Sequence, residues 1–225
     1  MPPLWKDDTA AQEQQAQRRA RMVQEQLRLR GIHDERLLSA MGQVPREKFI
    51  EPQFQAEAYA DGPLPIGVGQ TISQPLMVAT MIEALQVLAS DRVLEVGAGT
   101  GYQAAILGEL ASEVWTVERH GELADEARRV LLELGYRNVH VLQGDGSCGL
   151  PDQAPFDKIL IAAGAPQVPP SLIAQLVNGG AMAVPVGGRV EQELHLVRKI
   201  GGEVVTTRYG RCCFVPLVGA EGWKP

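Results

Sequence analysis

Cysteines and aromatic residues are scarce in this sequence of 225 residues, which contains 3 Cys, 4 Phe, 3 Trp and 4 Tyr. Cys148, Cys212 and Cys213 are odd in number and lack the C-x-x-C spacing of metal or redox sites. We therefore expect no disulfide framework and a reducing compartment. We interpret Cys212 and Cys213 as small strand residues, because adjacent cysteines bridge only with strain. The 4 His are scattered, so we expect no metal site.

Long apolar runs are also missing. None approaches the 18 residues of a membrane-spanning helix, and the N-terminal segment MPPLWKDDTA lacks the apolar stretch of a secretory signal. The net charge of −6 argues against binding to a nucleic-acid backbone, which requires a basic surface. The length and an apolar content of 45% predict a single globular domain, which we expect to be cytoplasmic and monomeric.

The N-terminal third is expected to be helical and then irregular. Residues 1–15 are polar and predict a frayed extension. Apolar residues at helical spacing predict an amphipathic helix over 16–31, with a second short helix around 37–41. The arginines between the apolar positions of the first helix are expected to form a solvated face. Residues 51–70 are rich in Pro and Gly and predict a long irregular stretch, which is often functional in a compact domain.

From residue 75 onward, helices and strands alternate. The pattern predicts strands at 92–97, 113–118, 139–143, 157–163 and 181–186, separated by helices at 75–85, 102–110, 122–134 and 171–177. Such alternation is typical of an α/β fold with a doubly wound, mostly parallel sheet. Segments 193–199 and 203–210 flank Gly201 and Gly202 and predict an antiparallel C-terminal hairpin.

A glycine-rich turn follows the first of the parallel strands. Residues 93–101 read VLEVGAGTG, in which Gly97, Gly99 and Gly101 lie between a strand and a helix. Glycines in this setting permit a tight turn and a close approach of the backbone to a ligand. The motif alone is weak evidence for a ligand site, because a glycine turn that binds nothing can have the same sequence.

Acidic residues after the next two strands strengthen the prediction. Glu118 ends the second strand, where a carboxylate can accept hydrogen bonds from ribose hydroxyls. Asp145 and Gly146 follow the third strand, and the Asp145 carboxylate would lie near an adenine amino group. Taken separately, Glu118 could be a solvated strand end and Asp145 a turn former. Together they predict a site for a cofactor that contains adenosine.

The acidic residue before the glycines indicates which adenosine-containing cofactor the site would bind. Glu95 lies two residues before Gly97, where a diphosphate would be disfavoured and a cationic ligand group favoured. VLEVGAGTG resembles the first motif of the Rossmann-like S-adenosylmethionine-dependent methyltransferases. S-adenosyl-L-methionine is therefore the expected cofactor, and NAD is the alternative.

The segment after the fourth parallel strand, IAAGAPQVPP, offers no general base and no metal ligand. An amine, catechol or phenol would need such a group for deprotonation or orientation. Its absence favours an acceptor that is already ionised at neutral pH, such as a carboxylate.

Residues 58–85 carry the most specific resemblance. The core IGVGQTISQP, residues 66–75, resembles the signature of the protein-L-isoaspartate O-methyltransferase family. Further similar segments are RGIHDERLL, VPREKF, GDG, AAGAP, GGAMAVPVG and FVPLVG, in the same order over residues 22–219. Leu76 departs from the pattern, since the family often has an aromatic residue there.

The resemblance implies methyl transfer from S-adenosylmethionine to the free α-carboxylate of L-isoaspartyl residues in damaged proteins and peptides, followed by collapse to a succinimide. It implies Ser73 as the active-site residue and Glu95, Gly97, Gly99, Gly101, Glu118, Asp145 and Gly146 as cofactor positions. The isoaspartyl pocket would be lined by the segment Ile66, Gly67, Val68, Gly69, Gln70 and Thr71. The expected organisation is a polar extension over 1–21 without activity and one domain over 22–225. This domain comprises a helical cover with the acceptor loop (22–74), the cofactor-binding sheet (75–190) and the C-terminal hairpin (191–225).

Other interpretations remain open. Ser73 precedes Pro75 and a helix, so helix capping is an alternative to catalysis. A neutral hydroxyl suits a carboxylate acceptor, because charge is lost as the reaction proceeds and a cation would favour the ground state. A small-molecule methyltransferase and an inactive binding module of the same fold are the alternative functions.

Overall fold

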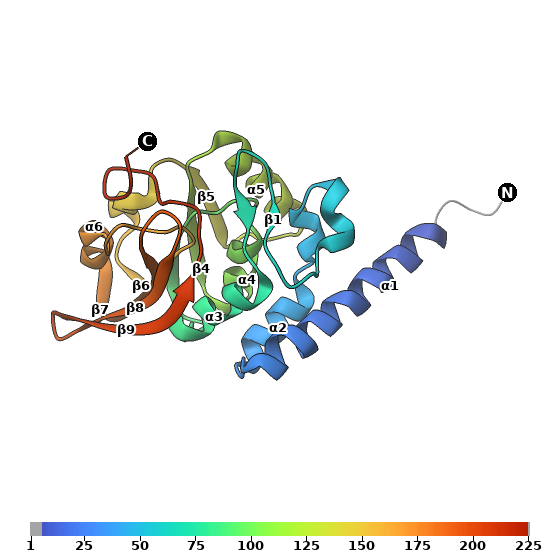
Figure 1. Cartoon of the computed structure of the whole chain (residues 1–225), viewed down its shortest axis with the longest axis horizontal. Coiled ribbons are helices and arrows are strands. Elements are labelled where there is room, and N and C mark those ends of the chain that lie inside the picture. The colour runs from blue at the N-terminus through green and yellow to red at the C-terminus, as the bar shows by residue number, and fades with distance from the viewer. Residues whose placement is uncertain (1–5, 225) are drawn as a thin grey trace.

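The computed structural model describes residues 6–224, and a seven-stranded sheet forms its centre (Figure 1). The strand order is β5-β4-β3-β6-β7-β8-β9. Their bounds are Arg92–Val96 (β3), Glu113–Glu118 (β4), Val139–Gln143 (β5), Phe156–Ile161 (β6), Leu176–Gly187 (β7), Gln192–Ile200 (β8) and Glu203–Cys212 (β9). Strands β5, β4, β3, β6 and β7 pair in parallel, whereas β7–β8 and β8–β9 pair antiparallel. The predicted doubly wound sheet with an antiparallel C-terminal hairpin is confirmed.

Helices connect and cover the strands. The α-helices are Lys6–Arg21 (α1), Glu35–Gln43 (α2), Pro75–Leu85 (α3), Tyr102–Leu110 (α4), Gly121–Glu133 (α5) and Pro170–Ala174 (α6). A π-helical stretch, Met22–Leu27 (η1), continues α1. Short 3₁₀ turns occupy Arg28–Arg30 (η2), Arg46–Phe49 (η3), Pro52–Glu57 (η4), Gly146–Cys148 (η5) and Pro151–Gln153 (η6). Helix α6 ends earlier than expected, because β7 already begins at Leu176.

The chain reverses its winding direction between β3 and β6. From β3 it proceeds outward to β4 and β5, and it then returns to place β6 on the other side of β3. In a parallel sheet, ligands bind outside the carboxyl ends of the strands at such a switch point. The topology alone therefore places the candidate site beyond Val96 and Ile161.

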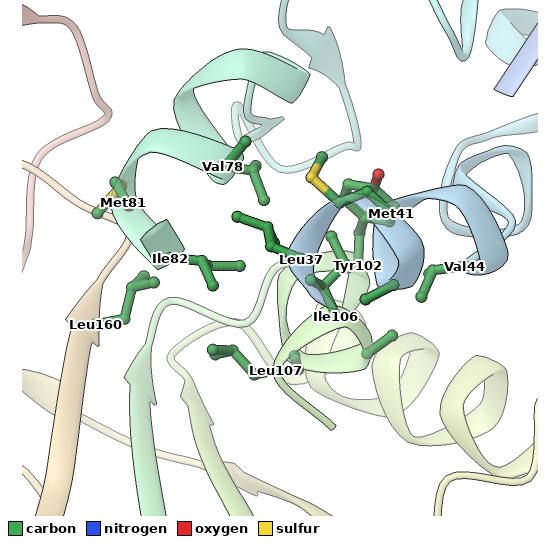
Figure 2. Packing of buried hydrophobic residues seen from close by; sticks show 14 of the residues in the cluster. Leu37, Met41, Val44, Val78, Met81, Ile82, Tyr102, Ile106, Leu107 and Leu160 are labelled. Carbon is green, nitrogen blue, oxygen red and sulfur yellow. The ribbon is translucent and has the colours of Figure 1, made fainter. Parts of the chain in front are cut away.

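Each face of the sheet buries its own apolar cluster. One cluster joins α2, α3, α4 and α5 to strand residues such as Val93 and Leu160, and the other lies against α6 and Leu217. Figure 2 shows Leu37 and Met41 of α2 beside Tyr102 and Ile106 of α4. Alternation of side chains along the strands divides them between the two faces, which explains why one domain has two clusters.

The N-terminal helix differs from the prediction. The helix ends at Gly31 as expected, but residues 6–15, predicted as a frayed extension, are the first part of α1, while residues 1–5 lie outside the described residues. The boundary expected after residue 21 falls inside a continuous helical segment. Two of its arginines are also only partly exposed and bind other segments: Arg18 donates to the Ala56 carbonyl, and Arg19 donates to the Gly42 carbonyl and the Tyr59 hydroxyl. They attach α1 to the residues that cover the sheet.

The stretch expected to be irregular contains ordered elements. Turn η4 is followed by β1 (Leu64–Pro65) and β2 (Thr71–Ile72), which pair antiparallel. The two short strands hold residues 66–70 as a loop between them. No helix in the described part of the chain is long and apolar enough to cross a membrane.

Leu107 of α4 is fully buried and should be a determinant of stability (Figure 2). We expect Leu107→Ala to lower the free energy of unfolding by about 2–5 kcal/mol, because it leaves a cavity in the core. Urea unfolding followed by circular dichroism measures this change. The control is Leu132→Ala, because Leu132 is also helical but 74% exposed, and a change of less than about 0.5 kcal/mol is expected. Equal losses in both variants would contradict the described core.

Candidate active site

A cavity of about 340 Å³ lies at the switch point of the sheet, and we call it the main cavity. Residues that follow β3, β4, β5 and β6 form its base, and residues 215–218 cover one side. Ile66, Gln70 and Thr71 close the opposite wall from the loop between β1 and β2. The volume lies within the range of sites for small molecules and cofactors.

Glycine is required at several points of this base because the backbone lies against neighbouring side chains. A Cβ atom on Gly99 would lie 2.9 Å from Cδ1 of Ile66, and one on Gly146 would lie 2.7 Å from Cγ1 of Val96. Gly97 has a φ of 96° and Gly99 a φ of 54°, in the left-handed region that favours glycine. Gly97, Gly99 and Gly146 line the main cavity, so the glycine-rich segments leave their backbone free to contact a ligand.

Gly101 has a different role. It caps α4 without lining the main cavity, and a Cβ atom there would lie 3.1 Å from Cδ1 of Leu131. Its small size therefore serves the packing of α4 against α5.

Glu118 is the acidic side chain that lines the main cavity. One carboxylate oxygen accepts a hydrogen bond from the Gly99 amide at 2.8 Å, and the other accepts one from the His120 amide at 2.9 Å. These bonds fix the carboxylate at the end of β4 and attach it to the glycine turn. A carboxylate has about four acceptor positions, so two remain for a ligand that donates hydroxyl groups.

Asp145 lies beside the main cavity rather than in its wall. Its carboxylate accepts hydrogen bonds from the amides of Ser147 and Ala220, at 2.9 and 2.8 Å. Burial acts to raise its pKa, but these hydrogen bonds outweigh it and hold the pKa below the ordinary value. Asp145 thus joins the turn after β5 to the C-terminal segment that covers the cavity, and Gly144 and Gly146 on either side of it line the wall.

Glu95 is fully buried and does not line the main cavity. Its side chain shares a face of the sheet with Val93, under the helices, and accepts a hydrogen bond from Thr116 of the neighbouring strand at 2.5 Å. Its second carboxyl oxygen has no partner. Burial raises the pKa of Glu95 to about 8, more than the Thr116 hydrogen bond lowers it. Glu95 does not reach the main cavity, so its contact with a cationic ligand group stays a prediction.

The loop between β1 and β2 is strained. Gly67, Val68 and Gly69 have φ values of 89°, 51° and 70°, and Val68 is a β-branched residue in a region that such residues avoid. Hydrogen bonds between Ile66 and Gln70 and from Gln70 to Gly67 close the loop. Ile66, Gln70 and Thr71 face the main cavity, whereas Gly67 and Val68 line a groove of about 690 Å³ against α5.

Ser73 follows this loop and lines a second, smaller cavity of about 40 Å³, which we call the side cavity. The side cavity shares Ile66, Thr71, Gly97, Gly99 and Ala162 with the main cavity, so the two are neighbours. The alternative interpretation, in which Ser73 caps α3, is wrong, because the N-cap residue of α3 is Gln74 and no side chain caps this helix. The Ser73 carbonyl accepts a hydrogen bond from Arg46, which leaves the hydroxyl at the side cavity.

Sequence reasoning missed several residues of the site. Arg119 and His120 follow β4 and line the main cavity, as do residues 215–218. Arg119 directly follows the predicted Glu118, so the strand end was a usable signal for it. Residues 215–218 reach the cavity through pairing with Gly164 and through Asp145, and no local pattern reveals those contacts.

These residues fit a cofactor that contains adenosine. The cavity is lined mainly by small and apolar groups, with Glu118 as a fixed acceptor, and its glycines leave space that a side chain would fill. Among the described residues, no group of three or more His, Cys, Asp or Glu side chains could hold a metal ion. The wall shared by the two cavities has no acid or base, so the site suits an acceptor that needs no deprotonation.

Known proteins resemble the chain over nearly all of its length. A protein-L-isoaspartate O-methyltransferase from Koribacter versatilis is 56% identical over 207 residues, which cover 92% of this chain and 93% of that protein. One from Methanoculleus marisnigri is 49% identical and covers 92% and 94%.

Solved structures agree. A protein-L-isoaspartate O-methyltransferase structure superposes with a TM-score of 0.80 at 29% identity and covers 90% of this chain and 66% of the other. A Plasmodium falciparum structure, described as a putative member of this family in complex with S-adenosyl-L-homocysteine, gives a TM-score of 0.78 at 25% identity and covers 89% and 98%. The sequence model of the family protein-L-isoaspartate(D-aspartate) O-methyltransferase matches residues 17–222. The chain therefore belongs to the protein-L-isoaspartate(D-aspartate) O-methyltransferase family.

Proposed function

We propose that this methyltransferase transfers a methyl group from S-adenosyl-L-methionine to the free α-carboxylate of L-isoaspartyl residues in damaged proteins and peptides. The resulting ester then collapses to a succinimide, whose hydrolysis partly restores aspartyl linkages. One observation carries the proposal: the loop at 66–70 with the following residues up to Ser73, and the glycine turn that contains Gly97 and Gly99, enclose two adjoining cavities. We further propose that the enzyme acts as a monomer in the cytoplasm.

The main cavity is the proposed cofactor site. When bound there, S-adenosylmethionine supplies an activated methyl group on a sulfonium, which leaves as a neutral thioether. Glu118 is proposed to bind the ribose hydroxyls, and the backbone of Gly97 and Gly99 to approach the ligand closely. Gly146 and the apolar residues 215–218 line the remainder of the cavity, while Asp145 and Gly101 hold the surrounding segments in place.

The side cavity and the loop at 66–71 form the proposed acceptor site. Val68 is 47% exposed, so the loop is accessible to a polypeptide substrate. The Ser73 hydroxyl is proposed to hold one carboxylate oxygen while the other attacks. An α-carboxylate is ionised at neutral pH, so no residue has to remove a proton. The main contribution of the protein is then alignment, which supplies roughly 7–11 kcal/mol in favourable cases.

The reaction is tested with paired peptides that differ only in one aspartyl or isoaspartyl linkage. The chain is incubated with radiolabelled S-adenosylmethionine, and base-labile label on the peptide is counted. We expect label on the isoaspartyl peptide alone, because a normal aspartyl residue has no free α-carboxylate. Label on neither peptide would contradict the proposed reaction and favour a small-molecule acceptor or an inactive binding protein.

Ser73→Ala tests the role of the hydroxyl. A hydrogen bond to a charged group contributes about 1.5–3 kcal/mol, so kcat/KM should fall roughly 10- to 100-fold. The dissociation constant for S-adenosylhomocysteine, measured by calorimetry, should stay unchanged, because Ser73 does not line the main cavity. Ser39→Ala, on the exposed side of α2, is the matched control and should keep full activity. Unchanged turnover in Ser73→Ala would remove the residue from the mechanism.

Glu95 should make stability dependent on pH. The folded chain keeps the Glu95 proton up to a pH of about 8, whereas an unfolded glutamate loses it near its ordinary pKa. Between these values the folded state binds the extra proton, so this residue lowers stability as pH rises. The free energy of unfolding of Glu95→Gln, relative to that of the wild type, should rise by up to about 1.4 kcal/mol per pH unit in this window. Above the window the difference should stay constant.

Urea unfolding at pH 5, 6.5, 8 and 9 measures that gain. Glu122→Gln is the control, because Glu122 is exposed on α5 and makes no described hydrogen bond with its side chain. A stability difference between Glu95→Gln and the wild type that stays constant with pH would show that Glu95 is ionised throughout.

A further inference from the structure

Arg46 is the largest fully buried side chain among the described residues. It begins η3, outside both cavities, and no carboxylate of the described chain lies within 4 Å of its guanidinium. Nη1 has no hydrogen-bond partner. A buried cation without a counter-ion is costly, so stability alone does not explain an arginine at this position.

The guanidinium contacts three separate segments. Nη2 donates to the Ser73 carbonyl at 2.8 Å, and Nε donates to the Ala58 carbonyl at 2.8 Å. The guanidinium carbon also lies 4.8 Å from the centre of the Tyr102 ring, a cation–π distance. Ser73 follows the acceptor loop, and Tyr102 is the first residue of α4, directly after the glycine turn.

The rest of η3 reinforces the attachment to the cofactor side. The Phe49 ring packs edge-on against Tyr102 with ring centres 5.6 Å apart, and the Phe49 carbonyl accepts a hydrogen bond from the Thr100 hydroxyl at 2.7 Å. Turn η3 is thus joined to the glycine turn through Thr100 and to the start of α4 through Tyr102, and Arg46 also binds Ser73.

We propose that Arg46 is a positioning residue for methyl transfer, which sets Ser73 and the acceptor loop at a fixed distance from the glycine turn. The inference rests on the proposed function, in which Ser73 holds the acceptor carboxylate. A planar guanidinium binds two carbonyls and a ring face in fixed directions, so it transmits the position of α4 to Ser73. Lysine has one flexible ammonium group and cannot hold this arrangement.

The location of Arg46 also suits the charge of the acceptor. In direct contact, a cation would bind the carboxylate ground state more tightly than the transition state. Arg46 instead lies behind the backbone of Ser73, with a neutral hydroxyl in front of it. It therefore supplies positive potential for an anionic group while leaving the direct contact to Ser73.

Arg46→Lys and Arg46→Met test the proposal in the full chain. A displacement of about 1 Å in an aligned site costs on the order of 100-fold in rate, so we expect kcat with an isoaspartyl peptide to fall at least tenfold in both variants. The dissociation constant for S-adenosylhomocysteine should stay within about twofold of wild type, because Arg46 does not line the main cavity. The peptide KM should rise in the Met variant only, since lysine keeps the charge.

Calorimetric stoichiometry gives the fraction of binding-competent protein, and kcat is expressed per competent site. A purely structural role would lower that fraction or the melting temperature without changing this corrected kcat. Arg36→Met is the matched control, since Arg36 also bridges two carbonyls, those of Val87 and Leu110, away from both cavities. It should lose stability and keep its corrected kcat within about twofold.

A corrected kcat near wild type in Arg46→Lys would overturn the proposal, even if Arg46→Met fails to fold. Failure of the proposed function has a different result, because the wild-type chain would then leave the isoaspartyl peptide unlabelled.

Discussion

The close approach of backbone segments at the carboxyl edge of the parallel strands is the constraint on which the site depends. At the switch point between β3 and β6, the turns after neighbouring strands converge, and a side chain on Gly99 or Gly146 would occupy space that Ile66 or Val96 already fills. The same convergence creates the main cavity, because small residues leave the strand ends uncovered. Glu118 then attaches the glycine turn to the end of β4 through its hydrogen bond to the Gly99 amide.

The proposed acceptor and cofactor sides are both built from segments distant in sequence, and this matches a reaction that is mainly a problem of alignment. The loop at 66–70 is held by the β1–β2 pair, and the C-terminal segment is attached through Asp145 and through Ser147, whose hydroxyl accepts from the Glu221 amide. A carboxylate acceptor requires no base, and the shared wall of the two cavities contains none. Rate enhancement must then come from orientation and from the polarity of the surroundings.

Local pattern predicted the central elements well, and non-local contacts explain the failures. Strands β4 and β5 and helix α4 have the predicted bounds, because apolar residues are buried along β4 and α4 and because Gly101 and Gly144 mark the start of α4 and the end of β5. The start of α1 was missed because its first turns are polar, and because the contacts that attach its last turn are non-local: the partners of Arg18 and Arg19 lie 38, 23 and 40 residues away. For the same reason, Arg46 gave no signal in the sequence, since its bonds reach residues 12 and 27 positions on.

Three departures from good packing occur around the site, and their location is informative. Val68 is held in a left-handed conformation, Arg46 is buried without a counter-ion, and Glu95 is a carboxyl group with an unpaired oxygen inside the sheet. Each lowers stability, and the two apolar clusters offset the loss. These three lie in the loop at 66–70, behind Ser73 and two residues before the glycine turn, whereas Gln86 at the end of α3 is a left-handed residue that lines neither cavity. For the loop and for Arg46, the location agrees with the proposed reaction, in which the position of Ser73 matters more than the stability that is lost.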